Sequence, residues 1–304
     1  MARKENKPEL TNLMDFYKVF PDDKSCREHL KKERFPDGKV ACSKCGSLDK
    51  IYELADGKRY KCGDCKHIFT ITVGTIFEAS HIELQKWFLA IYIVSAHKKG
   101  ISSLQLHRDI GVTQKTAWFM LHRIRYMLGT KAGRMMTGTV EADETYVGGA
   151  SKKHKKAGRG TVNKTAVFGM VERQGDVRAE SVARTDKKTL TTIIKKNISK
   201  DATIVTDEWA SYNYLDYDFK HKVINHSKAY AIGSIHINTI EGFWSLLKRG
   251  IFGIYHSVSP KHLDRYCDEF EYRYNTRKVN DAQRFNAVFT QCGGRLTYAT
   301  LINK

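Results

Sequence analysis

The sequence predicts an α/β or α+β protein in which a cysteine-rich module and a helical hairpin precede a larger domain that begins with a meander of strands. Three observations support this prediction. Four of the seven cysteines fall between residues 38 and 73, residues 80–128 carry apolar positions at helical spacing, and three strand-like segments follow in succession. With 304 residues, 41% of them hydrophobic, the chain has the length and composition for two or three domains with cores of their own.

The formal net charge of +19 indicates a polyanionic partner. A basic protein gains affinity for nucleic acid by releasing condensed counterions, although an acidic membrane surface or ribosomal RNA is compatible with the same charge. Residues 1–7 are polar, and the longest apolar run, residues 87–94, is too short to cross a bilayer. We therefore expect a cytoplasmic protein without a membrane partner, in which cysteines bind metal in preference to forming disulfides.

Two Cys-x-x-Cys pairs define the first module, which is expected at residues 37–78 after an N-terminal helical segment at 1–36. Sixteen residues separate Cys42 and Cys45 from Cys62 and Cys65. At this spacing the four thiolates surround one tetrahedral Zn²⁺, and four protein ligands leave no position open for a substrate. The sequence therefore predicts one structural zinc ion, whereas four unrelated buried cysteines would not explain the paired spacing.

Residues 79–130 are expected to form a helical DNA-binding region. A first helix begins with a capping box at Ser80 and Glu83. A helix-turn-helix follows, with its turn at residues 110–113 and its second helix at 114–128. One face of this second helix is apolar: Ala117, Leu121, Ile124 and Leu128. The polar residues are expected to remain largely outside: Gln114, Lys115, His122, Arg123 and Arg125.

A recognition helix needs this division between an apolar face and a polar one, because its N-terminal polar side chains reach base edges in the groove. Gln114, Lys115 and Thr116 are the candidates for groove contacts, and Arg123 is a further candidate for contact with DNA. The alternative is a helical hairpin whose basic face is merely solvated.

The larger domain is expected at residues 137–290, with a C-terminal tail at 291–304. Its predicted order begins with strands at 139–147, 165–172 and 176–183. A helix at 186–197 and a short strand at 202–206 follow, and then helices at 238–250 and 259–278, the last opened by Ser259 and Pro260.

Three acidic residues of this domain occupy unusual places. Asp143 lies inside the first strand, Asp207 ends the strand at 202–206, and Glu241 lies on the following helix. An acid on a buried strand usually pairs with a cation or coordinates one, although each acid taken singly is also compatible with a surface salt bridge. Carboxylate oxygens suit Mg²⁺ or Mn²⁺, and three acids can hold two such ions. Lys248 lies two turns after Glu241, on the same helix face.

The motifs around these acids resemble those of insertion-sequence DDE transposases that carry an N-terminal zinc ribbon, the insertion-sequence fifteen-ninety-five group with its ISXO-like transposase domain. The similar stretches are Glu141–Gly149, Thr206–Tyr212 and His236–Arg249, followed by Gly253–His256 and Arg273–Arg277. The run Val73–Phe77 after the ribbon is also similar. The resemblance covers most of residues 35–280.

The resemblance implies a ribonuclease-H-like (integrase-type) fold for the larger domain. By this resemblance Asp143, Asp207 and Glu241 form the catalytic triad and bind two Mg²⁺ or Mn²⁺ ions, with Asn238 as an alternative third ligand. Lys248, with the neighbouring Arg249, would contact DNA phosphate near the scissile bond. Glu141 is expected to share a strand face with Asp143 and to support it from outside the metal site. Glu144 is expected to point the other way and to have a structural role.

The segment between the first two strands is strongly basic. From residue 151 to 164 it holds six Lys or Arg residues and no acid. Contact with the DNA backbone and a solvated loop are both compatible with this run. The candidates for DNA contact are Lys152, Lys153, Lys155, Lys156 and Arg159.

The resemblance therefore predicts a bacterial-type, nucleoid-associated transposase that binds the ends of its element, nicks the DNA and joins the 3′-hydroxyl to target DNA. Its partner would be double-stranded DNA, and synapsis of two ends would need a dimer or a larger assembly on DNA. Two other functions stay open: a non-catalytic, domesticated DNA-binding regulator, and a metal-dependent nuclease of the same fold that never joins strands.

Overall fold

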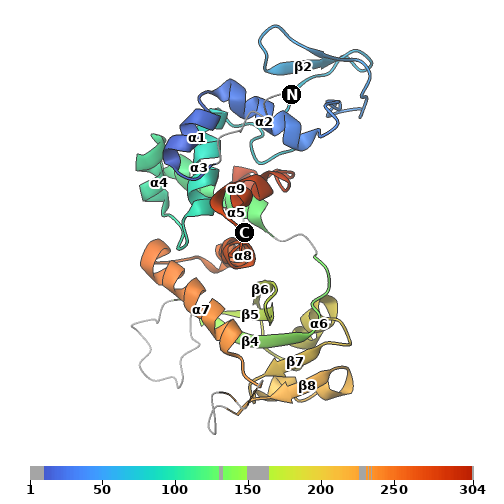
Figure 1. The fold of residues 1–304 in the computed structure, drawn as a ribbon, viewed down its shortest axis with the longest axis vertical. Coiled ribbons are helices and arrows are strands. Elements are labelled where there is room, and N and C mark those ends of the chain that lie inside the picture. The colour runs from blue at the N-terminus through green and yellow to red at the C-terminus, as the bar shows by residue number, and fades with distance from the viewer. Residues whose placement is uncertain are drawn as a thin grey trace, which may run out of the picture. The chain divides into compact units, whose positions relative to one another are not determined.

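The computed structural model describes residues 10–129, 133–148, 164–225, 231, 233 and 235–302. Within these ranges the chain forms two compact units (Figure 1). The first unit comprises the described parts of Met1–Leu128 and Val279–Lys304, and the second comprises those of Gly129–Lys278.

The first unit combines helices with a small antiparallel sheet in the order β1-β2-β3. Its helices are α1 (Leu13–Val19), α2 (Asp23–Arg34), α3 (Leu84–Ala96), α4 (Ser103–Ile110), α5 (Gln114–Leu128), α9 (Asp281–Phe289) and α10 (Tyr298–Ile302). Its strands are β1 (Ile51–Glu53), β2 (Arg59–Cys62) and β3 (Ile68–Thr70).

Aromatic packing explains why the C-terminal segment belongs to this first unit. The rings of Phe88 on α3 and Phe289 on α9 lie with their centroids 4.5 Å apart, and Phe285 lies 5.7 Å from Phe20. The apolar face of α9 is therefore completed by helices that come much earlier in the sequence. The larger domain that we expected at residues 137–290 is therefore too long at its C-terminal end, because the second compact unit ends at Lys278.

The helix-turn-helix has the predicted bounds within a residue. The Ser102 hydroxyl accepts a bond from the backbone N–H of Gln105, and Gly111 ends α4 in the left-handed conformation at φ +64°. The predicted capping box at Ser80 is wrong. α3 begins at Leu84, and the carboxylate of Asp23 on α2 accepts the N–H of Leu84 at 2.5 Å, so a residue from another helix takes the capping role.

The second unit is built on a five-stranded sheet in the order β6-β5-β4-β7-β8. The strands are β4 (Thr139–Val147), β5 (Thr165–Glu172), β6 (Val177–Val182), β7 (Thr203–Thr206) and β8 (Lys220–Val223). The helices are α6 (Lys187–Asn197), α7 (Asn238–Gly250) and α8 (Leu263–Asn275). Shorter helical segments are η1 (Ala210–Tyr212), η2 (Leu215–Tyr217), η3 (Ile251–Tyr255) and η4 (Pro260–His262).

The first three strands of this sheet form the predicted antiparallel meander, while β7 and β8 run parallel to β4 (Figure 1). One core packs α7 and α8 against the sheet, and a second core packs α6 against its other face. A meander followed by a helical crossover to a parallel strand beside the first one is the ribonuclease-H-like topology. The helix expected at 259–278 is shorter, because η4 precedes α8. No helix within the described ranges is both long and apolar enough to cross a membrane.

Candidate active site and zinc centre

The four predicted zinc ligands meet at the ribbon. The Sγ atoms of Cys42 and Cys65 are 3.6 Å apart and those of Cys45 and Cys62 are 3.7 Å apart. Zn–S bonds of about 2.3 Å in a tetrahedron require a sulfur separation of about 3.8 Å. All four ligand atoms lie within 4.8 Å of one another, which makes this the only such group of three or more His, Cys, Asp or Glu residues in the described part of the chain. The donor set therefore fits one structural zinc ion.

The central strand β4 carries the first predicted metal ligand, and β7 brings the second beside it. Thr139, Val140 and Glu141 pair in parallel with residues 203, 204 and 205 of β7. Continued by two residues, this register sets Asp207 opposite Asp143 on the neighbouring strand. Adjacent strands lie about 4.8 Å apart, and side chains opposite each other share a face of the sheet. Two acids that are far apart in sequence are therefore neighbours in the fold.

Helix α7, which carries Glu241, packs on the same sheet face and bonds directly to Asp143. The indole N–H of Trp244, a residue only 4% exposed, donates to Oδ2 of Asp143 at 2.8 Å. Gly169 pairs with Asp143 on β5, and a Cβ added at Gly169 would lie 2.4 Å from the Trp244 ring. The indole thus occupies the space that the glycine leaves, and its bond orients the carboxylate of Asp143.

Glu141 fixes the beginning of α7 on the strand. Its carboxylate is fully buried and accepts the backbone N–H groups of Thr239 at 2.8 Å and Ile240 at 3.1 Å. These are N–H groups of the first helical turn, which have no partner inside the helix. The Nε of Arg173 donates to the same carboxylate at 2.8 Å, and His236 lies 3.3 Å away. Glu141 therefore supports the site from beside it, and it shares the α7 face with Asp143 as expected.

Glu144 faces the opposite side of the sheet, where the hydroxyl of Tyr212 bonds to it. Burial raises the pKa of Glu144, and the charge of Asp207 raises it further, while the Tyr212 bond lowers it. Burial also raises the pKa of Asp143, to about 7, with the charges of Glu144 and Asp207 adding to the effect against the Trp244 bond. Mutually repelling carboxylates of this kind are stabilised either by protons or by a cation.

The remaining predicted residues of the site lie on α7. Asn238 and Glu241 are both exposed in its first turn, and Lys248 is half-buried in its last turn beside the exposed Arg249. Asp143, Asp207 and Glu241 do not close around one ion, because the described residues hold no such carboxylate group within 4.8 Å. Carboxylate oxygens are the donors that Mg²⁺ and Mn²⁺ prefer, so the donor set fits such ions by its chemistry.

Three of the residues predicted to contact DNA from the helix-turn-helix are accessible. The prediction for Arg123 is wrong, because this residue is buried. Gln114 and Lys115 are exposed at the start of α5, and Thr116 is half-buried. Arg123 is only 4% exposed, because its guanidinium donates to the carbonyl oxygens of Leu296 at 3.0 Å and Glu78 at 2.9 Å. His122 and Arg125 are buried as well, at 0% and 2% exposure, so the polar face of α5 is narrower than its sequence indicates.

The basic candidates Lys152, Lys153, Lys155, Lys156 and Arg159 lie outside the described residues. Two contributors to the site were missed in the sequence. Trp244 could have been found, since it follows Glu241 by one helical turn and therefore lies on the same face. Arg173 comes from the hairpin after β5 and carries no local signal of its role.

Comparison with known proteins follows the same division of the chain. Residues 135–275 match the family model of the ISXO2-like transposase domain, and residues 21–68 match that of the transposase zinc-ribbon domain. An uncharacterized protein in the transposable element ISH50 of Halobacterium salinarum is 28% identical over 84% of this chain and 92% of its own length. An uncharacterized transposase-like protein of Haemophilus influenzae is 32% identical over 32% of this chain and 80% of its own length.

Solved structures with related chains are more distant. The crystal structure of the Mos1 strand transfer complex shares 12% identity over 67% of this chain and 76% of the Mos1 chain, with a TM-score of 0.29. The simian T-cell lymphotropic virus intasome in complex with the PP2A regulatory subunit B56 gamma shares 14% identity over 55% of this chain and 63% of that chain, with a TM-score of 0.28. The fold assignment therefore rests on the sheet topology and the family model. Because the two matching family models cover the ribbon and the α/β unit and both describe transposases, the chain belongs to the IS1595 family of insertion-sequence transposases.

Proposed function

We propose that the protein binds the ends of its element, nicks the DNA by metal-dependent hydrolysis and joins the freed 3′-hydroxyl to target DNA. The observation that carries this proposal is the meeting of Asp143 on β4 with the helix of Glu241, through the 2.8 Å bond from Trp244. Asp207 ends the neighbouring strand at the same level. Carboxylates brought together on one face of a sheet suit in-line displacement at phosphorus.

The three acids have complementary roles in this proposal. Asp143 and Asp207 would hold the metal ions together with Glu241 or the alternative Asn238. Two Mg²⁺ or Mn²⁺ ions bound there would supply charge neutralisation for the attacking and leaving oxygens. Glu141 and Trp244 keep the acids in place during both steps, and Lys248 with Arg249 holds the phosphate backbone beside them.

The first unit supplies DNA recognition in the same proposal. Gln114, Lys115 and Thr116 at the start of α5 read base edges in the major groove of the element ends. The partner is double-stranded DNA of the nucleoid. A dimer or a larger assembly of the protein holds the two ends of the element together. Water cleaves one phosphodiester and leaves a 3′-hydroxyl and a 5′-phosphate. The 3′-hydroxyl then attacks a phosphodiester of the target and displaces the 3′-oxygen of the target strand, so no covalent protein–DNA bond is required.

The test is the variant Asp207→Asn, which keeps the shape of the side chain and removes its charge. We expect it to lose cleavage and joining by at least about 100-fold, because residues that only support metal ligands already cost about 10–100-fold. Affinity for the element ends should stay unchanged. Asp268→Asn on α8 is the matched control, since it makes the same replacement outside the site and should retain both reactions.

Strand transfer at the wild-type rate by Asp207→Asn would contradict the proposed mechanism. Cleavage without joining by the wild-type protein would identify a nuclease of this fold. Binding without any metal-dependent cleavage would identify the DNA-binding regulator.

A further inference from the structure

A cationic cavity of about 430 Å³ lies at one end of the meander in the second unit. Its polar lining comes from Lys164, Arg184, Thr165, Thr185 and Tyr146, and the other lining residues are small and apolar. None of the lining residues is acidic. The cavity therefore offers two cations and three hydroxyls to a ligand, with no carboxylate to repel an anion.

The register of the sheet places the two cations opposite each other. Ala166 on β5 pairs with Val182 on β6. Two residues further along this antiparallel register, Lys164 stands opposite Arg184. Like charges in directly opposite positions destabilise a sheet. Neither side chain has a carboxylate within salt-bridge distance among the described residues. An anion bound between them would remove the repulsion.

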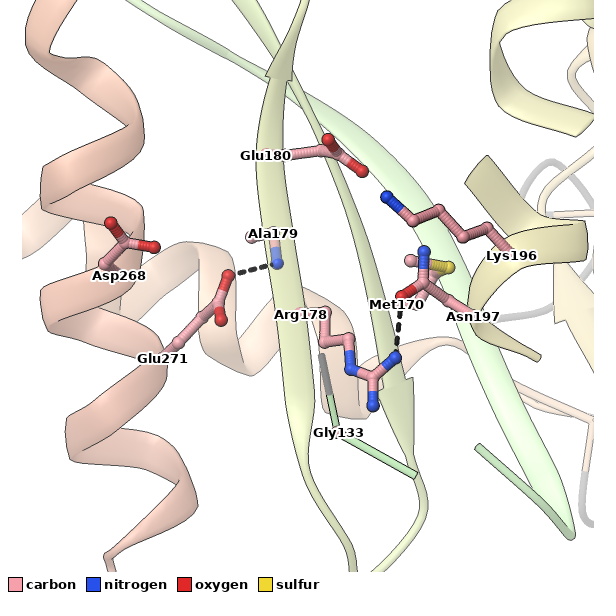
Figure 2. Close-up of a pocket in the computed structure, with 9 residues that line it drawn as sticks. All are labelled: Gly133, Met170, Arg178, Ala179, Glu180, Lys196, Asn197, Asp268 and Glu271. Carbon is pink, nitrogen blue, oxygen red and sulfur yellow. Dashed lines mark hydrogen bonds between the residues drawn. The ribbon is translucent and has the colours of Figure 1, made fainter. Parts of the chain in front are cut away.

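A second cavity of the same unit is lined by both cationic and anionic side chains. This cavity, of about 250 Å³, carries Arg178 and Lys196 together with Glu180, Asp268 and Glu271 (Figure 2). The Lys196 amine extends toward the Glu180 carboxylate, and the Arg178 guanidinium donates to the side-chain oxygen of Asn197 at 2.6 Å. The described lining of this cavity thus supplies carboxylates to its own cations, whereas that of the first cavity supplies none, and Arg184 interacts electrostatically with Asp186 outside the lining.

Two observations place the cationic cavity relative to the candidate active site. Tyr146 lies three residues after Asp143 on β4, which corresponds to about 10 Å along a strand. Thr185 accepts a bond at 2.9 Å from the hydroxyl of Ser211, in the segment that directly follows Asp207. Tyr146, like Glu144, faces the α6 side of the sheet, so the cavity lies on the other face of the sheet from the carboxylates.

We propose that this cavity binds a phosphodiester group of the DNA away from the one that reacts. The inference rests on the proposed function and deepens it, because it assigns a backbone contact to residues outside the helix-turn-helix and outside α7. Lys164 and Arg184 neutralise the phosphate, and the hydroxyls of Thr165, Thr185 and Tyr146 are available to donate to its oxygens. Contacts of this type fix the register of a duplex without reading its sequence.

The experiment measures how the affinity of the full chain for DNA depends on salt. Each phosphate that a protein neutralises contributes about 0.9 to the slope of log K against log salt concentration. The double variant Lys164→Gln/Arg184→Gln should therefore reduce this slope by about 1. The matched control is Lys195→Gln/Lys196→Gln, which removes the same net charge from α6, where Lys195 pairs with Asp218 at 2.7 Å. The control should keep the wild-type slope.

Two duplexes are compared, an element end and an unrelated sequence that represents target DNA. A smaller slope with the first duplex assigns the cavity to the element end, and one with only the second assigns it to the target. An unchanged slope in Lys164→Gln/Arg184→Gln, or an equal loss in both double variants, would overturn the proposal. If the wild-type protein shows no salt-dependent binding, the proposed function fails instead. Equal circular dichroism spectra and thermal midpoints establish that all variants are folded.

Discussion

The zinc centre and the carboxylate site hold their ligands in opposite ways. The four thiolates come from one stretch of the first unit and already lie within 4.8 Å of one another. The acids come from β4, the end of β7 and the first turn of α7, and they do not form such a group among the described residues. A closed ligand set suits a structural ion, whereas an open set leaves room for the phosphates of a substrate.

The difference also lies in what positions the ligands. Each Cys-x-x-Cys turn is a local structure with its own backbone bonds, such as that from Gly46 N–H to the carbonyl of Cys42 at 2.9 Å. The carboxylates depend on tertiary contacts, above all on Glu141 and Trp244, which attach α7 to β4. Metal binding at the zinc centre should therefore be weakened only by substitution of the four cysteines. Metal binding at the carboxylate site should also be weakened by substitution of residues that are not ligands.

Removal of zinc should have the largest effect. Structural zinc contributes on the order of 10–16 kcal/mol of binding free energy, which becomes folding free energy in a small module. We expect Cys62→Ser, or a strong zinc chelator, to unfold residues 37–78 and to weaken binding to the element ends. Zinc content and hydrogen exchange of the ribbon measure this effect. Exchange in β4 and α7 should stay as in the wild type.

If the ribbon keeps its hydrogen-exchange protection without zinc, zinc binding does not stabilise the fold of residues 37–78. The proposed difference between the closed and the open site would then be contradicted. Transfer into buffer without Mg²⁺, with no chelator added, provides the counterpart. Its effect should be confined to catalysis and should reverse as soon as Mg²⁺ is returned.

Glu141→Gln should have the next largest effect. This substitution removes the charge that pairs with Arg173 in a fully buried position, and breaking a buried ion pair costs about 3–5 kcal/mol. Chemical denaturation measures the loss, and hydrogen exchange should locate it at the start of α7. Glu172→Gln is the matched control, since Glu172 pairs with Arg134 and accepts the N–H of Thr137.

Both variants should lower stability, but only Glu141→Gln should raise the Mg²⁺ concentration needed for cleavage. An equal Mg²⁺ requirement in the two variants would show that Glu141 stabilises the unit without positioning its acids.

Trp244→Phe should have a smaller effect that is specific to the metal. The phenylalanine keeps an aromatic ring over Gly169 and removes the donor that orients Asp143. Loss of such an outer partner weakens metal affinity about 10–100-fold. Titration with Mn²⁺ measures the change, and saturating Mn²⁺ should restore most of the cleavage rate. The matched control is Trp87→Phe, which removes an indole bond of 2.9 Å to Ser80 in the first unit.

A Mn²⁺ requirement that shifts in both tryptophan variants, or in neither, would remove Trp244 from the positioning of Asp143. A shift in Trp244→Phe alone separates positioning from general packing.

The parts of the fold that the sequence predicted well are those with strong local signals. The bounds of β4, β5, α5 and α7 agree with their strand or helix periodicity, and the cysteine spacing identified the zinc ligands. Local reasoning failed where a distant residue decides the structure. Asp23 caps α3 from 61 positions away, and the carbonyl of Leu296 buries Arg123 from 173 positions away.

The carboxylate site lies between these two cases. Asp143 and Asp207 could be chosen because each is an acid on an apolar strand. Their alignment follows from the parallel pairing of β4 with β7, which no periodicity reveals. Glu141 was expected as a support because it shares a strand face with Asp143, but its bonds to the first turn of α7 became visible only in the fold.

The smallest effect concerns pH, and it separates Asp143 from a buried acid outside the site. Burial and a neighbouring carboxylate raise the pKa of both Asp143 and Asp268 from 3.8 to about 7. Between pH 4 and 7 each carboxyl thus holds a proton in the native state that the unfolded chain releases, so stability falls as the pH rises through this window. We expect Asp143→Asn and Asp268→Asn each to recover on the order of 2 kcal/mol at pH 7, allowing for partial exposure.

Mg²⁺ should distinguish the two acids, because a cation at the open site replaces the proton of Asp143 and leaves Asp268 unaffected. Denaturation curves from pH 4 to 7 are measured for each variant with and without Mg²⁺. In Asp268→Asn, where Asp143 remains, Mg²⁺ should flatten the pH dependence. In Asp143→Asn, where Asp268 remains, it should leave the pH dependence as it is. If Mg²⁺ acts equally in both variants, Asp143 is an ordinary buried acid, and the distinction between a closed and an open metal site no longer holds.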